Sequence, residues 1–428
     1  MNVAYICSSL LALVALSVPA LAASDVVSEW NQQAGICALE AKQNAPFATR
    51  TLAMVHTAMF DAINSVEGRY TPYKFKAAAA PGSSAEAAGV AAAHAVLEKL
   101  FPDQKSAIDA TYTASLAKIP EGSGKTAGIA IGEEIAAKIL ALRSSDGADA
   151  PNDYQPRTAP GVYVATMLPV VPHWGSVTPW VMQRGPQFRP GPPPSLSSPQ
   201  WARDYNEVKD LGGTKSTSRT AEQTGIARFW IITGPQVADP IARQLAGAPG
   251  RSLIQNARLF AQLEMAVADA YIAVFDAKYA FNFWRPITAI RNGDLDGNDA
   301  TARDPEWEPT IDTPPHPEYP CAHCISSATA RAVLEAEFGA GPHALSMTSA
   351  TAPGVERHWT SIKEFADEVS SARIYGGIHY RNSTEVAKQM GAKIGALTVQ
   401  VELTPISHTA QVPLPHTDQI EQAVQSKK

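Results

Sequence analysis

Apolar residues recur at helical spacing along most of this 428-residue chain. An apolar residue at every third or fourth position indicates a helix with one buried face. Strand patterns, in which apolar and polar residues alternate, are weak throughout, and the chain has no internal repeat. The sequence therefore predicts an all-α protein whose core is one helical bundle. We expect helices at residues 49–66, 84–100, 125–142, 201–211, 220–232, 239–246, 252–283, 325–338, 361–374 and 383–403.

Residues 145–200 interrupt this helical pattern. The segment is rich in proline, including GPPPSLSSP, and has few periodic apolar positions. Tyr163, Trp174 and Trp180 nevertheless give it large side chains to bury. We therefore expect an ordered excursion or lid rather than a random linker.

These boundaries suggest one domain over residues 23–428. Its N-terminal helices fall within 23–144, the proline-rich excursion follows, and the main C-terminal bundle covers about 250–403. A second proline- and acid-rich loop spans 292–320, and the tail from Thr404 is polar. We expect the N-terminal helices to pack around the C-terminal bundle.

The bulk composition is that of a protein with a sizeable core. Hydrophobic residues make up 45% of the chain and charged residues 18%, and the net charge is −6. A nucleic-acid-binding surface would favour a basic balance, so we expect no nucleic-acid partner.

The N-terminus has the pattern of a secretory signal. Residues 6–18 are mostly apolar and small, and Ala20-Leu21-Ala22 fits a cleavage site. We predict a signal peptide at 1–22 and a periplasmic or secreted mature protein; an uncleaved anchor is the alternative. The apolar run is too short to favour a permanent membrane span, and no later stretch approaches the required length.

The cysteine count is odd once the signal is removed. Cys7 would leave with the signal, and Cys37, Cys321 and Cys324 would remain. At least one of the three must therefore be unpaired within the monomer.

Two cations stand close together in KYAFNFWRP. Lys278 and Arg285 are seven residues apart, which places them on one face of a helix. Pro286 is expected to end that helix, leaving Arg285 at its C-terminus, where a cation suits the helix dipole. The alternative is an ordinary solvated basic face.

A histidine follows at a predicted helix start. Pro320-Cys321-Ala322-His323 directly precedes an apolar-periodic run that ends at Gly339. The free N–H groups of Ala322 and His323 would point outward there, and the helix dipole favours an anion. The alternative is a helix start with an incidental histidine.

The third motif is RIYGGIH. Arg373 and His379 are six residues apart, a poor spacing for one helix face, and Gly376-Gly377 permits a break. Arg373 is expected to end one helix, and His379 to open the next segment. A neutral His379 nitrogen could then face an electrophilic phosphorus or vanadium; the alternative is a core histidine.

Three permanent cations and two histidines on one site would suit a small oxyanion such as phosphate or vanadate. In this order the motifs resemble the superfamily of vanadium-dependent haloperoxidases and type-2 phosphatidic-acid-phosphatase-like acid phosphatases. Its pattern is Lys-x6-Arg-Pro, then Pro-Ser-Gly-His, then Ser-Arg-x5-His. The segments LAMVHTAMFDAIN, GRYTPY, NEVKDLG and RTAEQTGIARFW also look like bacterial haloperoxidase-related proteins, so the resemblance covers nearly all of the mature chain.

The resemblance implies a role for each residue. Lys278, Arg285 and Arg373 would bind the equatorial oxygens, and the Ala322 amide would donate a further hydrogen bond. Cys321 stands at the position of the hydroxyl donor. His379 would be the axial vanadium ligand, or the nucleophile of a phosphatase, and His323 the acid/base partner. His316, seven residues before His323, matches a second active-site histidine of bromoperoxidases, where chloroperoxidases have an aromatic residue.

The family also implies partners. A haloperoxidase would hold vanadate and use peroxide and halide, with bromide or iodide favoured. A phosphatase would need no cofactor and would act on a phosphomonoester. A homodimer is expected by analogy.

Two positions depart from the family pattern. The family Ser-Gly is Cys321-Ala322 here; a thiol is a weak donor, and peroxide would oxidise it at a helix N-terminus. It could pair with Cys324, or Cys37 could pair with either. The family aspartate four residues after the ligand histidine, which would orient a histidine, is Ser383 here, and this puts the basicity of His379 or His323 in doubt.

Other readings of these segments were weighed. Cys321-Ala-His-Cys324 also fits a thiol–disulfide oxidoreductase or a zinc site, although no βαβ pattern surrounds it. Residues 294–299 resemble a calcium loop in composition, but an acidic surface turn fits better. The hypotheses are thus a haloperoxidase, an acid phosphatase, or a degenerate oxyanion-binding or redox protein.

Overall fold

The computed structural model describes residues 25–406. The predicted signal peptide at 1–22, Cys7 and the end of the polar tail lie outside the described residues. Within the described part the chain is mostly helical and contains one two-stranded sheet. The predicted all-α fold is confirmed.

Five helices and one 3₁₀ turn form the N-terminal region. Their starts show ordinary capping chemistry: Asn44, for example, accepts a hydrogen bond from the Phe47 amide at the start of α2. Gly68 ends α2 in the left-handed conformation. The elements are α1 (Val26–Glu40), α2 (Ala45–Glu67), α3 (Ala85–Leu100), η1 (Pro102–Gln104), α4 (Lys105–Ala117) and α5 (Ser123–Arg143).

The middle of the chain is irregular before it becomes helical again. Thr220 and Gln223 form a capping box at the start of α7. The elements are η2 (Trp174–Ser176), η3 (Gly185–Phe188), α6 (Pro199–Gly212), α7 (Ala221–Phe229) and α8 (Pro235–Ala246).

The C-terminal part holds the longest helices. The elements are α9 (Leu253–Phe281), α10 (Pro286–Arg291), η4 (Gly293–Leu295), α11 (Ala322–Phe338), β1 (Leu345–Ser349), β2 (Ala352–Trp359), α12 (Ile362–Tyr375) and α13 (Arg381–Val401). The two strands pair antiparallel, with Leu345 opposite Trp359.

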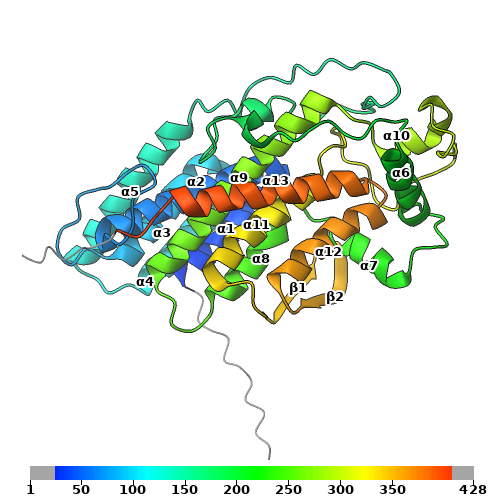
Figure 1. The fold of residues 1–428 in the computed structure, drawn as a ribbon. Helices are drawn as coiled ribbons and strands as arrows, with labels where there is room; N and C mark the ends of the chain where they lie inside the picture. The colour runs from blue at the N-terminus through cyan, green and yellow to red at the C-terminus, as the bar shows by residue number, and fades with distance from the viewer. Residues whose placement is uncertain (1–24, 407–428) are drawn as a thin grey trace, which may run out of the picture.

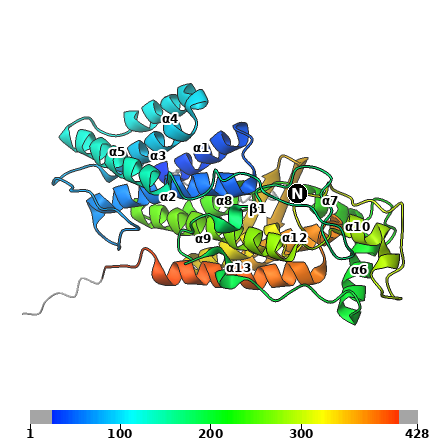
Figure 2. The same ribbon diagram turned by 90° about the horizontal axis from the view of Figure 1, so that it is seen from above.

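The helices form layers in an elongated molecule. Helix α9 packs against α2 on one side and against α11 and α13 on the other, and α2 in turn packs on α3 and α5. Figures 1 and 2 show α3, α4 and α5 at one end, and α6, α7, α10 and α12 at the other. One hydrophobic core contains residues from α1 to α13 and joins the N-terminal helices to the C-terminal bundle through α1 and α2, while the division of the chain stays a prediction.

Helix α9 is the central element of this arrangement. Most of its 29 residues are buried, on every side of the helix. A helix that is apolar all round is stable only when other elements cover it completely. Any polar residue on α9 is therefore either paired inside the protein or part of a site.

The excursion at 145–200 is ordered, and the core holds it in place. Tyr163, Trp174 and Trp180 are buried, as predicted. Asp269 of α9 accepts hydrogen bonds from the backbone amides of Trp180, Val181 and Met182 at 2.7 to 2.9 Å. One buried carboxylate thus fixes this part of the excursion to the central helix.

The sequence pattern missed three helices and both strands. Helix α10 has six residues, too few to show periodicity. Helix α4 buries only Ile108 and Ser115, and strand β2 is mostly exposed, so neither shows a clear apolar pattern. Helix α1 was also missed, although it buries one face.

Candidate active site

Lys278 lies in the last turn of α9 and is fully buried. Its Nζ donates to the backbone carbonyls of Pro317 and Glu318, both at 2.9 Å. An ammonium has three donors, so one remains for another acceptor. This lysine ties the central helix to the loop before α11.

The predicted position of Arg285 was wrong. Helix α9 ends at Phe281, where Asn282 adopts the left-handed conformation. Arg285 is the residue before α10, and Pro286 is the first residue of that helix. Proline suits a first helical turn, because its missing N–H would have no partner there. Lys278 and Arg285 therefore do not share one helix.

Arg285 nevertheless reaches the same site and connects two segments of it. Its Nε donates to the His316 carbonyl at 2.9 Å, and its Nη1 to the Ile378 carbonyl at 2.8 Å. Nη1 also lies 3.2 Å from His379 Nε2, and Nη2 lies 3.0 Å from His316 Nδ1. A guanidinium only donates, so His379 Nε2 accepts. His316 Nδ1 lies between Arg285 Nη2 and the Pro317 carbonyl, which is 3.1 Å away.

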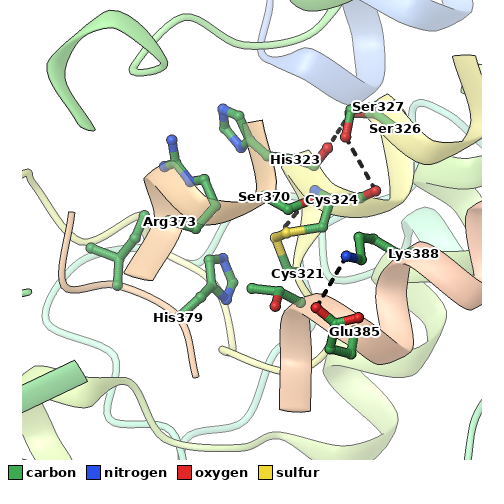
Figure 3. The surroundings of a disulfide bond; sticks show 12 residues. Cys321, His323, Cys324, Ser326, Ser327, Ser370, Arg373, His379, Glu385 and Lys388 are labelled. Atoms are coloured by element: carbon green, nitrogen blue, oxygen red, sulfur yellow. Dashed lines mark hydrogen bonds and ion pairs between the residues drawn. A yellow bond between two sulfur atoms is a disulfide. The ribbon is translucent and has the colours of Figure 1, made fainter. Parts of the chain in front are cut away.

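The Pro-Cys-Ala-His segment begins a helix, as predicted. Cys321 caps α11, and Ala322 is its first residue. Cys321 and Cys324 form a disulfide, and the Cys324 amide donates to the Cys321 sulfur at 3.1 Å. Figure 3 shows His323, Arg373 and His379 among the surroundings of this disulfide.

The disulfide corrects several expectations about Cys321. A disulfide sulfur has no proton, so Cys321 donates no hydrogen bond to an oxyanion. Because neither sulfur is a free thiolate, a zinc site at Cys321, His323 and Cys324 is also excluded in this state. The thiol that peroxide would attack is absent, and Cys37 is the unpaired cysteine among the described residues.

Arg373 and His379 lie on either side of the glycine pair, as predicted. Arg373 is in the last turn of α12, and His379 precedes α13. Gly377 has φ +79°, and a Cβ there would lie 2.3 Å from the Gly212 carbonyl oxygen. Only glycine fits this close approach, which turns the chain so that His379 faces Arg285.

His379 has a carboxylate partner that the sequence analysis missed. Its Nδ1 lies 2.7 Å from Oε1 of Glu318, which also accepts from the Tyr380 amide at 3.1 Å. Glu318 is fully buried and is the one acid in the segment PPHPEYPCAH. That isolated acid inside a motif was the available signal. Ser383 does not replace it, because its side chain interacts with Glu318 and makes no hydrogen bond to His379 among the described residues.

His323 and His316 complete the group of buried histidines. His323 Nε2 lies 2.9 Å from the Ile232 carbonyl, so this nitrogen carries the proton and Nδ1 is the basic nitrogen. The His316 ring lies 5.2 Å from that of Phe275, measured between ring centroids. Each ring is thus fixed by a neighbour from a distant part of the chain.

A cavity of about 200 Å³ opens over these residues. Its polar lining includes His316, His323, Arg373, His379 and the first residue of α11, Ala322. The rest of the lining is mostly apolar and comes from α2, α9 and the loops at 170, 233 and 314–315: Ala45, Pro46, Val170, Tyr271, Phe275, Pro314 and Pro315. The predicted residues therefore meet at one small pocket, with Lys278, Arg285 and Cys321 just behind its surface.

Burial and mutual repulsion shift the pKa of every ionisable group here. Burial lowers the pKa of Lys278 well below its usual value, that of Arg285 to about 10 and that of Arg373 to about 9. Burial, together with nearby cations, lowers the pKa of His316, His323 and His379 well below the ordinary value. At neutral pH all three imidazoles are therefore uncharged.

These residues fit a tetrahedral oxyanion such as vanadate or phosphate. The buried Arg373 Nε has no hydrogen-bond partner within the described chain, and Arg373 lines the pocket. Lys278 has a donor in reserve, and the first turn of α11 offers backbone amides. An anion would provide acceptors for these groups and offset the repulsion among three buried cations.

The acidic turn at 294–299 has a structural role. Asp296 is buried and accepts from Trp201 Nε1 at 2.7 Å and from the Thr301 hydroxyl at 2.7 Å. Within residues 25–406 no group of three His, Cys, Asp or Glu side chains is arranged to hold a metal ion. The turn reading is favoured over the calcium loop.

Comparison with known proteins finds a matching family model, a similar sequence and similar folds. The family described as VCPO second helical-bundle domain matches residues 258–407. Vanadium chloroperoxidase of Curvularia inaequalis is 28% identical over 185 residues, which are 36% of this chain and 30% of that protein. The alignment thus spans less than a third of that relative's length.

Solved structures resemble nearly the whole fold. A bacterial vanadium-dependent iodoperoxidase superposes with a TM-score of 0.76 at 26% identity, covering 89% of this chain and 96% of that one. A bacterial vanadium-dependent chloroperoxidase gives 0.69 at 17% identity, covering 83% and 91%. From its motifs, its fold and these relatives, the chain belongs to the superfamily of vanadium-dependent haloperoxidases and type-2 phosphatidic-acid-phosphatase-like acid phosphatases.

Proposed function

We propose that this protein is a vanadium-dependent haloperoxidase-like enzyme that oxidises bromide or iodide with hydrogen peroxide. One observation carries the proposal: His379 presents a neutral nitrogen beside three buried cations at a small cavity. A lone pair next to a strongly positive pocket suits an anion whose central atom accepts a ligand. The relatives with this fold are named as vanadium peroxidases.

The side chains divide the work of binding. Lys278, Arg285 and Arg373 would hold the oxygens of vanadate, with the Ala322 amide as a further donor. His379 would be the ligand through Nε2, the nitrogen that accepts from Arg285. When bound, vanadate supplies a Lewis acid that activates peroxide toward halide.

Two further histidines would handle protons and substrate. His323 keeps its Nε2 proton on the Ile232 carbonyl, which leaves Nδ1 to accept a proton within the pocket. His316 lines the same cavity beside Phe275. Its position matches the second histidine of bromoperoxidases, which motivates the preference for bromide or iodide.

A phosphatase is the second candidate, because the same groups suit phosphate. His379 would then attack phosphorus as a neutral nucleophile, and His323 would take up a proton at Nδ1 before passing it to the leaving oxygen. The cavity of about 200 Å³ would admit only a small phosphomonoester. The third hypothesis, a degenerate oxyanion-binding or redox protein, was motivated by a free Cys321 thiol and by Ser383; the disulfide and the Glu318 carboxylate beside His379 favour an intact site instead.

Parallel assays on the purified protein distinguish the two candidates. Bromide and iodide oxidation by peroxide, and hydrolysis of p-nitrophenyl phosphate, would each be measured with and without orthovanadate. We expect halide oxidation only with vanadate present. Phosphate ester hydrolysis that vanadate inhibits would instead identify a phosphatase.

The matched variants are His379→Ala and His358→Ala. His379 is buried in the site, whereas the His358 side chain is 70% exposed on β2. We expect the first variant to have no activity and the second to match wild type. Full activity in His379→Ala would remove His379 from its role.

Export and assembly remain proposals of the same kind. The Cys321–Cys324 disulfide supports a periplasmic or secreted protein, because disulfides persist in oxidising compartments. None of the helices between residues 25 and 406 is both long and apolar enough to span a membrane. Mass analysis of the mature chain would test cleavage after Ala22, and light scattering would test the homodimer.

A further inference from the structure

The imidazole of His379 is held at both nitrogens. Arg285 Nη1 approaches Nε2 at 3.2 Å, and Glu318 Oε1 approaches Nδ1 at 2.7 Å. Because the guanidinium can only donate, Nε2 must be the acceptor. Because the carboxylate accepts, Nδ1 must carry the proton. The contacts therefore select one tautomer, the one whose lone pair is on Nε2, where Arg285 donates a hydrogen bond to it.

Glu318 is itself rigidly placed. It is 0% exposed, and its Oε1 also accepts from the Tyr380 amide at 3.1 Å. Its backbone carbonyl accepts from Lys278 Nζ at 2.9 Å, and its amide donates to the Phe283 carbonyl at 2.9 Å. Both ends of the residue are thus fixed by groups of the site. A carboxylate with this little freedom can set the orientation of a neighbouring ring.

No other acid takes this place. The family pattern has an aspartate four residues after the ligand histidine, where this chain has Ser383. The Ser383 side chain is buried and interacts with Glu318, and a hydroxyl carries no negative charge to face His379. The carboxylate that faces His379 comes instead from 61 residues earlier, in the loop before α11.

We propose that Glu318 is the positioning residue of His379: it fixes the Nδ1–H tautomer and the ring orientation, so that Nε2 faces the bound oxyanion. The proposal rests on the proposed role of His379 as the oxyanion ligand. The orienting carboxylate of this chain is then Glu318, whereas the family pattern has an aspartate at the position of Ser383. Removal of such a partner typically weakens binding or activity about 10- to 100-fold.

The test uses the full mature protein without oxyanion, labelled with ¹⁵N-histidine. Nuclear magnetic resonance reports which imidazole nitrogen of His379 carries the proton, and His379→Gln assigns the signal. We expect a single Nδ1–H tautomer in wild type. In Glu318→Ala the ring loses its acceptor, so we expect mixed tautomers. Glu318→Gln keeps an oxygen for Nδ1–H and should retain the wild-type tautomer.

Binding of tungstate, a tetrahedral oxyanion that is not readily reduced, gives the second readout. We expect the dissociation constant to rise about 10- to 100-fold in Glu318→Ala and less in Glu318→Gln. The control is Glu385→Gln, whose carboxylate pairs with Lys388 on the partly exposed face of α13. It should bind tungstate as wild type does.

The proposal is overturned if Glu318→Ala keeps the single Nδ1–H tautomer and binds tungstate within about threefold of wild type. A wild-type protein with the proton on Nε2 overturns it as well, whether or not the variants fold. Neither readout depends on turnover. If the wild-type protein showed neither halide oxidation nor phosphatase activity, the proposed function would be wrong. The role of Glu318 would still be decided by the tautomer of His379 and by tungstate binding.

Discussion

Two groups of buried charges differ in how they can be neutralised. The active site holds Lys278, Arg285 and Arg373 against a single carboxyl, Glu318. A second group, which we call the Asn31 cluster, lies between α1, α2, α8 and α9. It consists of the buried residues Asn31, His56, Asp239 and Glu264 and the partly buried Arg243.

The Asn31 cluster can neutralise its own charge, although His56 Nδ1 and Glu264 Oε1 have no hydrogen-bond partner among residues 25–406. Asn31 donates to Asp239 at 3.0 Å and to His56 Nε2 at 3.1 Å, and it accepts from Arg243 at 2.6 Å. Burial raises the pKa of Asp239 to about 6 and that of Glu264 well above its usual value. The excess acid can therefore take up a proton and become neutral.

The active site cannot do the same. Arginine keeps its proton at any physiological pH, so two of its three cations stay charged. Their donors mostly meet backbone carbonyls, which carry no net charge, and Arg373 Nε meets no acceptor in the part of the chain described here. Buried cations that cannot lose a proton are stabilised only by a bound anion. This need for an anion distinguishes the active site, as a ligand-binding site, from the Asn31 cluster, which is structural.

The largest expected effect comes from breaking the site. In Arg373→Met a buried cation is replaced by an apolar chain of similar length. Tungstate affinity should fall about 100-fold, the value of a strong hydrogen bond to a charged group. Stability should stay equal or rise, because the uncompensated charge is gone. Calorimetric titration and urea unfolding measure the two effects; Arg331→Met, on the outer face of α11, is the control. Lower stability with unchanged affinity would reverse the assignment.

Breaking the Asn31 cluster should do the opposite. Asn31→Ala leaves Asp239, His56 and Arg243 without their shared partner. We expect a loss of about 3 kcal/mol in the free energy of unfolding, as buried polar groups become unsatisfied. Tungstate affinity should not change. A matching loss of affinity would show that the two regions are coupled.

The pH dependence of stability sharpens the comparison through His56. Burial lowers the pKa of His56 to about 3. Unfolded histidine titrates near 6.5, so below that pH the unfolded state binds more protons, and stability falls as the pH drops. Relative to His56→Gln, wild type should lose about 2 kcal/mol between pH 6.5 and 5. Urea unfolding at four pH values measures this; a constant difference would mean that His56 is protonated in the fold.

The smallest effect is expected at the disulfide. Cys321→Ser with Cys324→Ala restores a hydroxyl at the start of α11 and leaves no free thiol there. Tungstate affinity should rise, by up to about tenfold for one added hydrogen bond. Stability should fall by about 2 kcal/mol, as a short closed loop is lost. Unchanged affinity would show that the disulfide does not weaken the site.

Local features of the sequence were enough to predict the positions of most of the helices. Ser84 and Gly339 mark helix ends, and apolar spacing marks the buried faces of α2, α9 and α13. The same kind of signal failed at Arg285, because Pro286 begins a helix here instead of ending one. A proline allows both outcomes, and only the packing of α10 on α6 decides between them.

The members of the site were also visible in the sequence, but their contacts were not. Spacing placed His323 at a helix start and His379 after a glycine break, and both are found there. The pairing of Cys321 with Cys324 was one of several open choices. The partner of His379 was missed, because Glu318 is 61 residues away in the chain and carries no periodic signal.

The sequence by itself determined where the chain is helical, where it turns and which charged residues were candidates for one site. These features depend on neighbours within a few residues, so local spacing encodes them. The tertiary structure decided which groups touch: that Glu318 holds His379, that Arg285 links His316 to His379, and that Arg373 is left with an unpaired donor within residues 25–406. Such contacts depend on how distant helices pack. A buried charge without a partner is unstable, so a bound ligand of opposite charge stabilises it.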